Sequence, residues 1–535
     1  MMRGPTNDRL FLPEGRKTEG ATREVVFTFF LVLGFALTLT GITVPYRGVH
    51  IPFPVMVALG FLFTGYCLRL ALEDFHKIML LFAVYIPFQK ELAGDFGGLL
   101  RAFNMTNILI LTMALGWFSQ SFLEGRSVYK RRSADLPVFL FMFLGSISLI
   151  RSEITRVDLD FLELVFVLKR WAEPMLVYYI FVNNIRDRRD VWWVVFVVCL
   201  MTGLVGMIGL KEYYIDIGGL WRYPSSLDRC RIKGIADQPN QFGAYFCYYS
   251  FYMVSFFFHY LYEKKFWIFL IPIAVCGRAM LLCFSRGATI SFAVAAYATT
   301  WFWNRKVALL LLTPVLCYFV MNPDMIPSVI MGRLKPTVET VREYGPGNAR
   351  ETIGEMDASA YGRINLWYLG VQIVKRNPVF GVGFGNYPRV SQELAREGVE
   401  VPFGGLVTEQ WDPHSTYVAI ATEMGVPALI LFLLILGIFA KSAWGICRGS
   451  HDRFFRSIAV GYLGGMVGLL VVNIFGSRLF DTNEVVTHFW IMSAVILCVR
   501  DMVDEEVAKS PASVNVTDSA SSGRHAELGR NQLES

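Results

Sequence analysis

The sequence predicts an all-α polytopic membrane protein with about 12–14 transmembrane helices. The hydrophobic fraction of the 535 residues is 54%, the charged fraction is only 18%, and long apolar stretches recur along the chain. A soluble chain of this length divides into several domains with far more charge. Many of the stretches approach the roughly 20 apolar residues that cross a bilayer core.

The apolar stretches follow one another through most of the chain. The first lacks a small-residue cleavage site, so it predicts a span and not a signal peptide. Two stretches are short, and one is broken by Lys169 and Arg170. The expected spans are 25–44, 51–72, 78–89, 106–120, 136–150, 162–182, 191–210, 242–262, 266–285, 287–303, 307–321, 419–440, 457–476 and 488–500.

Basic residues between the spans predict the topology. The formal net charge of +6 is spread over loops, so it indicates orientation in the membrane and not a nucleic-acid partner. If residues 1–24 are cytoplasmic, alternation of the spans puts every dense basic connector on the same side. These connectors are Arg126/Lys130/Arg131/Arg132, Arg186/Arg188/Arg189, Lys264/Lys265, Arg305/Lys306 and Lys441/Arg448/Arg453/Arg456.

The other side of the membrane then receives two long loops, 211–241 and 322–412. Both termini are cytoplasmic on this reading, and the tail has too few large apolar residues to fold alone. The expected segments are a cytoplasmic N-terminal segment 1–24, a transmembrane bundle 25–321, a large extracytoplasmic loop 322–412 with amphipathic helices, C-terminal transmembrane helices 413–500 and a disordered cytoplasmic tail 501–535.

Several sequence features argue against disulfide, metal and dinucleotide sites. Seven of the nine cysteines lie in apolar stretches and none forms a CxxC pair, so neither a disulfide frame nor a zinc site is expected. Asp158 and Asp160 could hold a metal, but an isolated acidic pair is usually a solvated loop. The glycines of 381–385 lack the strand–turn–helix context of a dinucleotide site, so they predict a turn. We therefore expect no metal and no cofactor.

His414 opens an apolar segment on the predicted extracytoplasmic side. Asp412 and Pro413 before it resemble a helix N-cap and a first-turn proline, which would place His414 in the first turn and favour the neutral imidazole. Tyr417 would follow on the same helical face, where it could contact a substrate. Glu423 would point away from that face, and Pro427 predicts a kink because it cannot donate to the carbonyl of Glu423. For a single histidine, a role in capping the helix is the commoner one.

Two arginines on the same side strengthen a functional interpretation. Arg286 follows the outer end of the span 266–285, and Arg363 opens an amphipathic segment whose Leu366, Trp367, Ile373 and Val374 could lie on the membrane surface. Guanidinium groups bind diphosphate oxygens in bidentate fashion. Taken singly, each arginine is as often an interfacial anchor as a functional group.

Three further residues are candidates for substrate binding. Arg278 lies inside an apolar stretch, where a charge is either functional or part of a structural pair. Arg231 and Asn240 lie in or beside the loop 211–241, and Asn240 belongs to a run, Asp237-Gln238-Pro239-Asn240, that forms either a substrate-facing segment or a simple turn.

Four motifs resemble the O-antigen ligase and Wzy-type O-antigen polymerase superfamily. They are SRGA at 285–288, YGRINLW at 361–367, RNPVFGVGFGNY at 376–387 and PHSTYVAIATEMGVP at 413–427. The family's order is kept, and the resemblance is strongest from about 280 to 440. His414, Ser415 and Gly425 fit a pattern frequent in ligases, but Ala428 departs from its last position, so ligase and polymerase both stay open.

The resemblance implies a metal-independent glycosyltransferase of GT-C-like fold in the bacterial inner membrane, with its active site on the extracytoplasmic side. Its donor would be an undecaprenyl-diphosphate-linked glycan, and its acceptor a sugar on lipid A-core or on a growing glycan. His414 would correspond to the catalytic histidine, and Arg286 and Arg363 to diphosphate-binding arginines.

Two other classes of function remain open from the sequence. A polysaccharide or lipid transporter would also be polytopic, but it would place charges along a central path and show related halves. No internal repeat is visible here, and the polar residues gather at one face. A non-catalytic assembly subunit would tolerate the loss of His414.

Overall fold

The computed structural model describes residues 53–89, 104–155, 161–219, 230–236, 238–322, 358–402, 412–477 and 483–508. Every regular element in these ranges is a helix, which confirms the all-α prediction. The expected first span 25–44, the pair Asp158 and Asp160, and Asp237 lie outside the described residues.

The chain divides into two compact units, Met1–Tyr85 with Lys90–Gln120, and Ile86–Gln89 with Ser121–Ser535. The first unit contains α2 (Phe53–Glu73), α3 (Phe75–Tyr85) and most of α5 (Met105–Leu123). Close packing joins α2 to α5, because a Cβ added at Gly116 would lie 2.7 Å from the Cβ of Ala71. The hydroxyl groups of Tyr85 and Thr106 form a buried hydrogen bond of 2.5 Å between α3 and α5.

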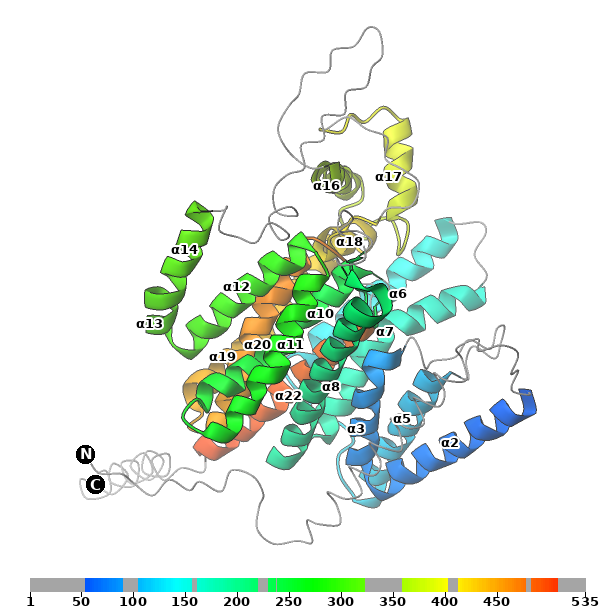
Figure 1. The fold of residues 1–535 in the computed structure, drawn as a ribbon. Helices are drawn as coiled ribbons and strands as arrows, with labels where there is room; N and C mark the ends of the chain where they lie inside the picture. The colour runs from blue at the N-terminus through cyan, green and yellow to red at the C-terminus, as the bar shows by residue number, and fades with distance from the viewer. Residues whose placement is uncertain are drawn as a thin grey trace, which may run out of the picture. The chain divides into compact units, whose positions relative to one another are not determined.

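The second unit holds the remaining helices (Figure 1). Its α-helices are α6 (Asp135–Thr155), α7 (Phe161–Asn184), α8 (Arg188–Lys211), α10 (Pro239–His259), α11 (Leu270–Leu282), α12 (Arg286–Trp303), α13 (Arg305–Val307), α14 (Thr313–Met321), α16 (Ala358–Arg376), α17 (Tyr387–Arg396), α18 (Thr416–Glu423), α19 (Val426–Gly449), α20 (Arg453–Val472) and α22 (Asn483–Ala508). Short 3-10 or π turns are η1 (Ile86–Phe88), η3 (Glu212–Ile217), η5 (Lys264–Phe269) and η6 (Ala308–Leu312).

Seven helices in the described ranges are long and apolar enough to cross a membrane, so the chain is a multi-pass membrane protein. They are Met105–Leu123, Asp135–Ser152, Arg188–Ile217, Lys264–Leu282, Val426–Gly449, Arg453–Val472 and Val485–Ala508. The total of 12–14 spans stays a prediction, because shorter and more polar helices accompany these seven.

The expected span 162–182 corresponds to α7, which continues as one helix through Lys169 and Arg170. The Lys169 ammonium lies 2.9 Å from the carboxylate of Glu173 on the next turn. One expected boundary was wrong. α22 runs to Ala508, so the predicted start of the tail at 501 is too early.

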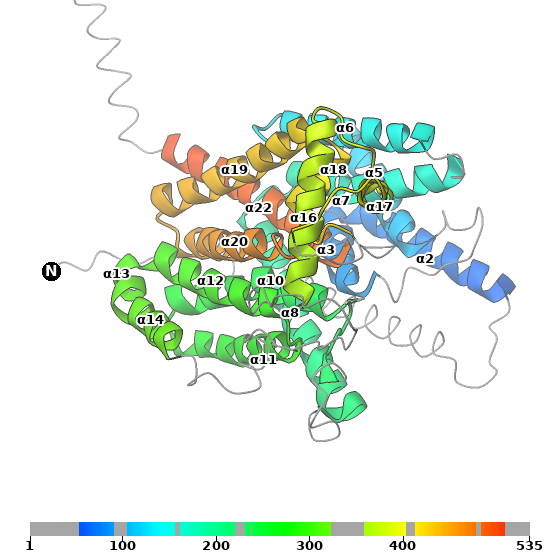
Figure 2. The same ribbon diagram turned by 90° about the horizontal axis from the view of Figure 1, so that it is seen from above.

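Glycines let α20 pack closely at the centre of the second unit. A Cβ at Gly464 would lie 1.9 Å from the Thr299 hydroxyl of α12, and one at Gly465 would lie 2.4 Å from the Tyr248 carbonyl of α10. Small residues of this kind let membrane helices approach closely. Figure 2 shows α20 beside both α12 and α10. The place of α20 is therefore fixed by backbone contact.

The bundle surfaces at the two ends of α19 carry different kinds of segment. α19 begins at Val426, directly after α18, and ends at Gly449, so its ends lie about 36 Å apart at 1.5 Å per residue. Beyond its far end, Arg188 pairs with Asp452 at 2.9 Å. At the near end, α16, α17 and α18 lie across the ends of the bundle helices (Figure 1). Basic connectors and the predicted site segments thus gather at opposite ends.

We predict that the end carrying α16 to α18 faces the extracytoplasmic side. In a background with Cys317 and Cys447 replaced by Ser, Glu400→Cys should react with a membrane-impermeant maleimide in intact cells. Lys265→Cys should react only after the membrane is opened. Glu400 and Lys265 are both exposed, so each cysteine variant serves as the control for the other. The reverse pattern would place the site on the cytoplasmic side and contradict the prediction.

Candidate functional site

The segment Asp412–Ser415 forms the mouth of α18. The helix begins at Thr416, and its N-cap is Ser415, not Asp412 as the sequence suggested. His414 therefore lies before the helix, with a backbone φ of +47° that no helical residue adopts. Its Nδ1 atom lies 2.8 Å from Oδ1 of Asp412. The Asp412 carboxylate pairs with the imidazole and does not cap the helix.

Tyr417 does not share a helical face with His414, because His414 lies outside the helix. The Tyr417 hydroxyl donates to the carbonyl of Leu470 at 2.9 Å, which joins α18 to α20. Burial raises the pKa of Tyr417 to about 12, so this hydroxyl is a hydrogen-bond donor at neutral pH. Its role in substrate binding stays a prediction.

The end of α20 holds the start of α18. The amide of Thr416 donates to the carbonyl of Asn473 at 3.0 Å, and the Thr416 hydroxyl bonds to the Asn473 side chain. The same hydroxyl lies 3.3 Å from the carbonyl of Gly476. All of these groups are buried. Thr416, the first residue of α18, is therefore held by hydrogen bonds to the turn 473–476.

Arg286 begins a helix that packs on the same turn. The Ser285 hydroxyl caps α12 by accepting from the amide of Ala288, which makes Arg286 its first residue. A Cβ added at Gly287 would lie 3.1 Å from Cβ of Phe475. Phe284, two residues before Arg286, has a φ of +47°. Thus the turn 473–476 supports the start of α12 as well as the start of α18.

Arg231 and Asn240 support the turn that precedes Arg286. Arg231 donates from Nε to the carbonyl of Cys283 at 3.0 Å and from Nη2 to Oδ1 of Asn240 at 2.8 Å. This brings the loop residue Arg231 and the first turn of α10 to the end of α11. The two predicted residues are therefore brought together next to the start of α12.

Arg278 lies on the surface of α11. Its guanidinium is exposed and donates to the Tyr214 hydroxyl at 3.0 and 3.1 Å. The charge is thus hydrogen-bonded outside the interior of the bundle, and its role in substrate binding stays a prediction.

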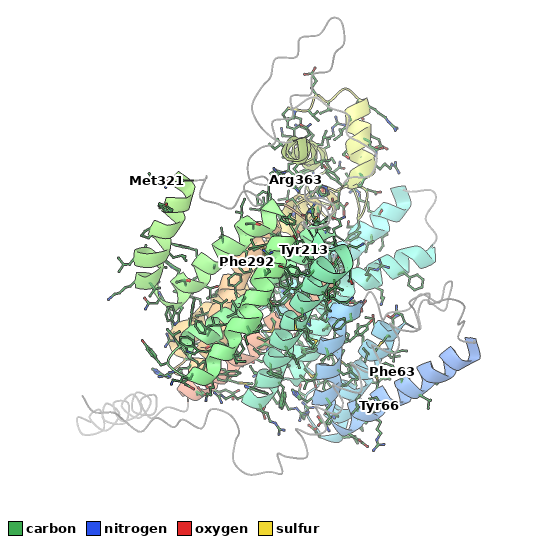
Figure 3. All side chains as sticks on the ribbon, viewed as in Figure 1. Phe63, Tyr66, Tyr213, Phe292, Met321 and Arg363 are labelled. Atoms are coloured by element: carbon green, nitrogen blue, oxygen red, sulfur yellow. The ribbon has the colours of Figure 1, made fainter. Side chains whose placement is uncertain are left out.

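Arg363 lies on α16, which the structure ties directly to the mouth of α18. The Trp367 indole N–H donates to the carbonyl of Pro413 at 3.0 Å. Arg363 precedes Trp367 by four residues on the same helix, so both side chains project from one face. Figure 3 shows Arg363 where α16 meets the ends of the bundle helices. The helix of Arg363 is thus bonded to the residue before His414.

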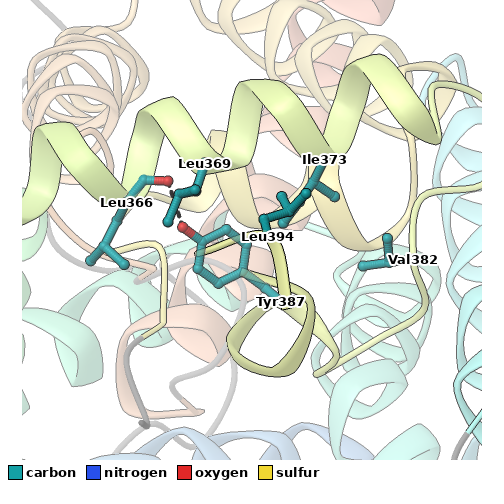
Figure 4. Close-up of a cluster of buried hydrophobic side chains, with 6 residues drawn as sticks. All are labelled: Leu366, Leu369, Ile373, Val382, Tyr387 and Leu394. Atoms are coloured by element: carbon teal, nitrogen blue, oxygen red, sulfur yellow. Dashed lines mark hydrogen bonds between the residues drawn. The ribbon is translucent and has the colours of Figure 1, made fainter. Parts of the chain in front are cut away.

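Two of the four apolar residues of α16 that were expected on the membrane surface, Leu366 and Ile373, are instead buried inside the protein. Leu366 is 3% exposed and Ile373 is fully buried, because both pack against the segment that follows the helix. The Tyr387 hydroxyl also donates to the carbonyl of Leu366 at 2.5 Å. Figure 4 shows this cluster, which consists of Leu366, Leu369, Ile373, Val382, Tyr387 and Leu394.

The glycine-rich run 381–385 forms a turn, which confirms the prediction. Gly381, Gly383 and Gly385 all have a positive φ. The amides of Val382 and Gly383 donate to the carbonyls of Thr422 and Glu423, at 2.8 and 3.0 Å. Here two backbone segments meet with no side chain between them.

Gly425 completes this contact from the side of α18. It has a φ of +92° and separates α18 from α19, so the predicted kink is a complete break. The amide of Val426 donates to the carbonyl of Pro378 at 2.8 Å. Glu423 serves as a scaffold: its carbonyl accepts from the Ser148 hydroxyl at 2.7 Å, and its buried carboxylate accepts from the amide of Tyr387 at 3.3 Å.

The candidate site brings Arg231, Arg286, Arg363 and His414 onto connected elements, and Asp412 is the acidic partner of His414. In the part of the chain that the structure describes, no three His, Cys, Asp or Glu side chains are grouped to hold a metal ion. Sequence reasoning missed two functional candidates, Asp412 as the partner of His414 and Trp367 as the anchor of Pro413. The spacing Asp-Pro-His was the available signal for the first, but it also fits an N-cap.

Fold and site define a polytopic membrane protein with a polar site at one end of its helices. Residues 255–433 match the model of the family described as O-Antigen ligase (Wzy_C). The match spans about a third of the 535 residues and contains all four motifs, with Arg286, Arg363 and His414. The match confirms the resemblance to the O-antigen ligase family over this segment. No curated protein matches the chain.

We predict that Gly381→Ala and Gly425→Ala disrupt the site by forcing two backbone segments apart. A Cβ at Gly381 would lie 2.4 Å from the carbonyl carbon of Glu423, and one at Gly425 would lie 2.1 Å from the carbonyl oxygen of Val379. Gly398→Ala is the matched control, because Gly398 has a φ of +84° but open space around its Cβ. The backbone strain alone costs about 1–3 kcal/mol.

The measurement is the apparent melting temperature of each purified variant in one detergent. Gly381→Ala and Gly425→Ala should lower it clearly more than Gly398→Ala does. Equal shifts for all three variants would show that positive φ, and not contact between segments, limits these positions.

Proposed function

We propose that the chain is a glycosyltransferase that transfers or polymerises an undecaprenyl-diphosphate-linked glycan on the extracytoplasmic face of the bacterial inner membrane. The observation that carries this proposal is the convergence of three site elements. The start of α12 with Arg286 and the mouth of α18 with His414 share the turn 473–476. α16 with Arg363 is bonded to Pro413.

The arginines bind the donor in this mechanism. Arg286 and Arg363 each present a planar guanidinium that can donate two parallel hydrogen bonds to diphosphate oxygens. As the bond between the anomeric carbon and the diphosphate oxygen breaks, negative charge grows on the departing lipid diphosphate. Donors already in place stabilise that charge at no cost of reorganisation.

His414 acts on the acceptor. Its imidazole takes the proton of an acceptor hydroxyl, and the oxygen attacks the anomeric carbon of the donor glycan. The electron pair of the breaking bond leaves with the lipid diphosphate. A single displacement inverts the configuration at the anomeric carbon. The reaction needs no nucleotide, because the diphosphate bond supplies the driving force.

A ligase and a polymerase differ in the acceptor: a ligase transfers the glycan to a lipid A-core sugar, and a polymerase transfers it to a growing glycan. Ala428 departs from the ligase pattern, but it is fully buried in α19 and contributes to helix packing. Ligase and polymerase both stay open. Analysis of a deletion strain separates the two: a ligase defect leaves long glycans on the lipid carrier, whereas a polymerase defect leaves single repeat units.

We predict that Arg286→Lys and Arg363→Lys each reduce glycan transfer although the charge is kept, because one ammonium cannot replace a planar fork. The expected loss in transition-state stabilisation is about 2–4 kcal/mol. Arg376→Lys is the control, since Arg376 lies on α16 and forms an exposed pair with Glu397 at 2.7 Å. Transfer rates are compared at equal protein in lipid vesicles. Near-normal rates for both test variants would reduce these arginines to interfacial anchors.

We predict that His414→Asn inserts normally and binds the lipid-linked donor but loses about 10²- to 10⁴-fold in transfer rate. Asparagine keeps a hydrogen-bonding side chain but cannot accept the proton at neutral pH. His451→Asn is the control, because His451 is exposed and lies beyond the far end of α19. Transfer and donor binding are measured on the same purified samples. Substantial transfer by His414→Asn would contradict the assignment of His414 as the base.

A further inference from the structure

The short contact between Asp412 and His414 defines which nitrogen of the imidazole carries a proton. Nδ1 of His414 lies 2.8 Å from Oδ1 of Asp412. An ionised carboxylate only accepts hydrogen bonds, so Nδ1 must be the donor. In the neutral ring the lone pair is then at Nε2. The structure thus selects one of the two tautomers of the imidazole.

The backbone around the pair is held on both sides. On one side, Trp367 donates to the carbonyl of Pro413 at 3.0 Å, and the proline ring itself fixes φ at this residue. On the other side, Ser415 is buried, and the amide of Thr416 is bonded to Asn473. Both side chains of the pair therefore project from a segment with little freedom.

The conformation of His414 also has a cost. A non-glycine residue with φ near +47° costs of order 1–3 kcal/mol, and such strain persists only where the surrounding structure enforces it. The strain is consistent with selection for the direction of this ring. A residue that only capped the helix could adopt an ordinary extended backbone, as Ser415 does.

We propose that Asp412 is a positioning residue that fixes the tautomer and direction of the His414 imidazole for proton abstraction. This inference rests on the proposed function. The acceptor proton moves to Nε2, while the proton on Nδ1 stays in its hydrogen bond to Asp412. The carboxylate remains ionised throughout and stabilises the imidazolium that forms. Asp412 itself touches no reacting atom.

An ordinary surface ion pair has a different signature. The side chains of His414 and Asp412 are 31% and 44% exposed, and exposed pairs contribute little to stability. Loss of Asp412 should therefore leave the melting temperature almost unchanged. A positioning role requires a large loss in rate with no loss of stability or donor binding.

The first test is Asp412→Asn, with Glu397→Gln as the matched control. Glu397 is an exposed acid at the same end of the bundle, and its partner is Arg376. An asparagine amide can hold the wrong tautomer, a change that elsewhere costs up to about 10⁴-fold in kcat. We expect kcat to fall about 10²-fold or more, with KM for the lipid-linked donor unchanged. An unchanged kcat overturns the inference.

The second test is chemical rescue of Asp412→Ala. Formate supplies a small carboxylate that can occupy the place of the missing side chain. Formate should restore part of the transfer rate, whereas chloride at the same ionic strength should not. Absence of rescue, together with a lowered melting temperature of the variant, would assign Asp412 a structural role and overturn the inference.

The third test needs no substitution at Asp412. Nitrogen-15 NMR of ring-labelled histidine in lipid, at a pH where the imidazole is neutral, reports which nitrogen is protonated; His414→Gln assigns the signal. Protonated Nδ1 supports the inference, and protonated Nε2 overturns it. Failure of the proposed function looks different, because His414→Asn would then transfer glycan normally. If His414→Asn is inactive and Asp412→Asn is fully active, the proposed function stands and only the positioning role of Asp412 is contradicted.

Discussion

The contact between the glycine-rich turn 381–385 and the end of α18 is the interaction on which the site depends. Two amides of the turn donate to the last carbonyls of α18, and Val426 donates back to Pro378. The last carbonyls of a helix have no partner within it, so this arrangement satisfies them with backbone donors. It also fixes the short α18 between α16 and the bundle. Without that fixed point, His414 would have no defined position relative to either arginine.

Hydrogen bonds to neutral groups join the three site elements in the described part of the chain. Trp367 to Pro413, Thr416 to Asn473 and Arg231 to Cys283 all end on backbone carbonyls or a neutral side chain.

The sequence was sufficient for the fold class, because long apolar stretches are a strong signal of membrane spans. The break between α18 and α19 was also visible, since Pro427 cannot donate to Glu423. The start of α18 was not predictable, because the spacing Asp-Pro-His is also typical of an N-cap at Asp412. Only the positive φ of His414 shows that the helix begins later. The burial of Leu366 and Ile373 escaped prediction because an apolar helix face looks the same against lipid and against protein.

The two non-glycine residues with positive φ in the described part of the chain are Phe284 and His414. One precedes Arg286 by two residues, and the other is the proposed base. Such strain is a cost to folding that a glycine would remove. At position 414, however, glycine would also delete the imidazole, so on the proposed mechanism a more stable protein would be an inactive one. Selection for stability and selection for activity therefore oppose each other at this residue.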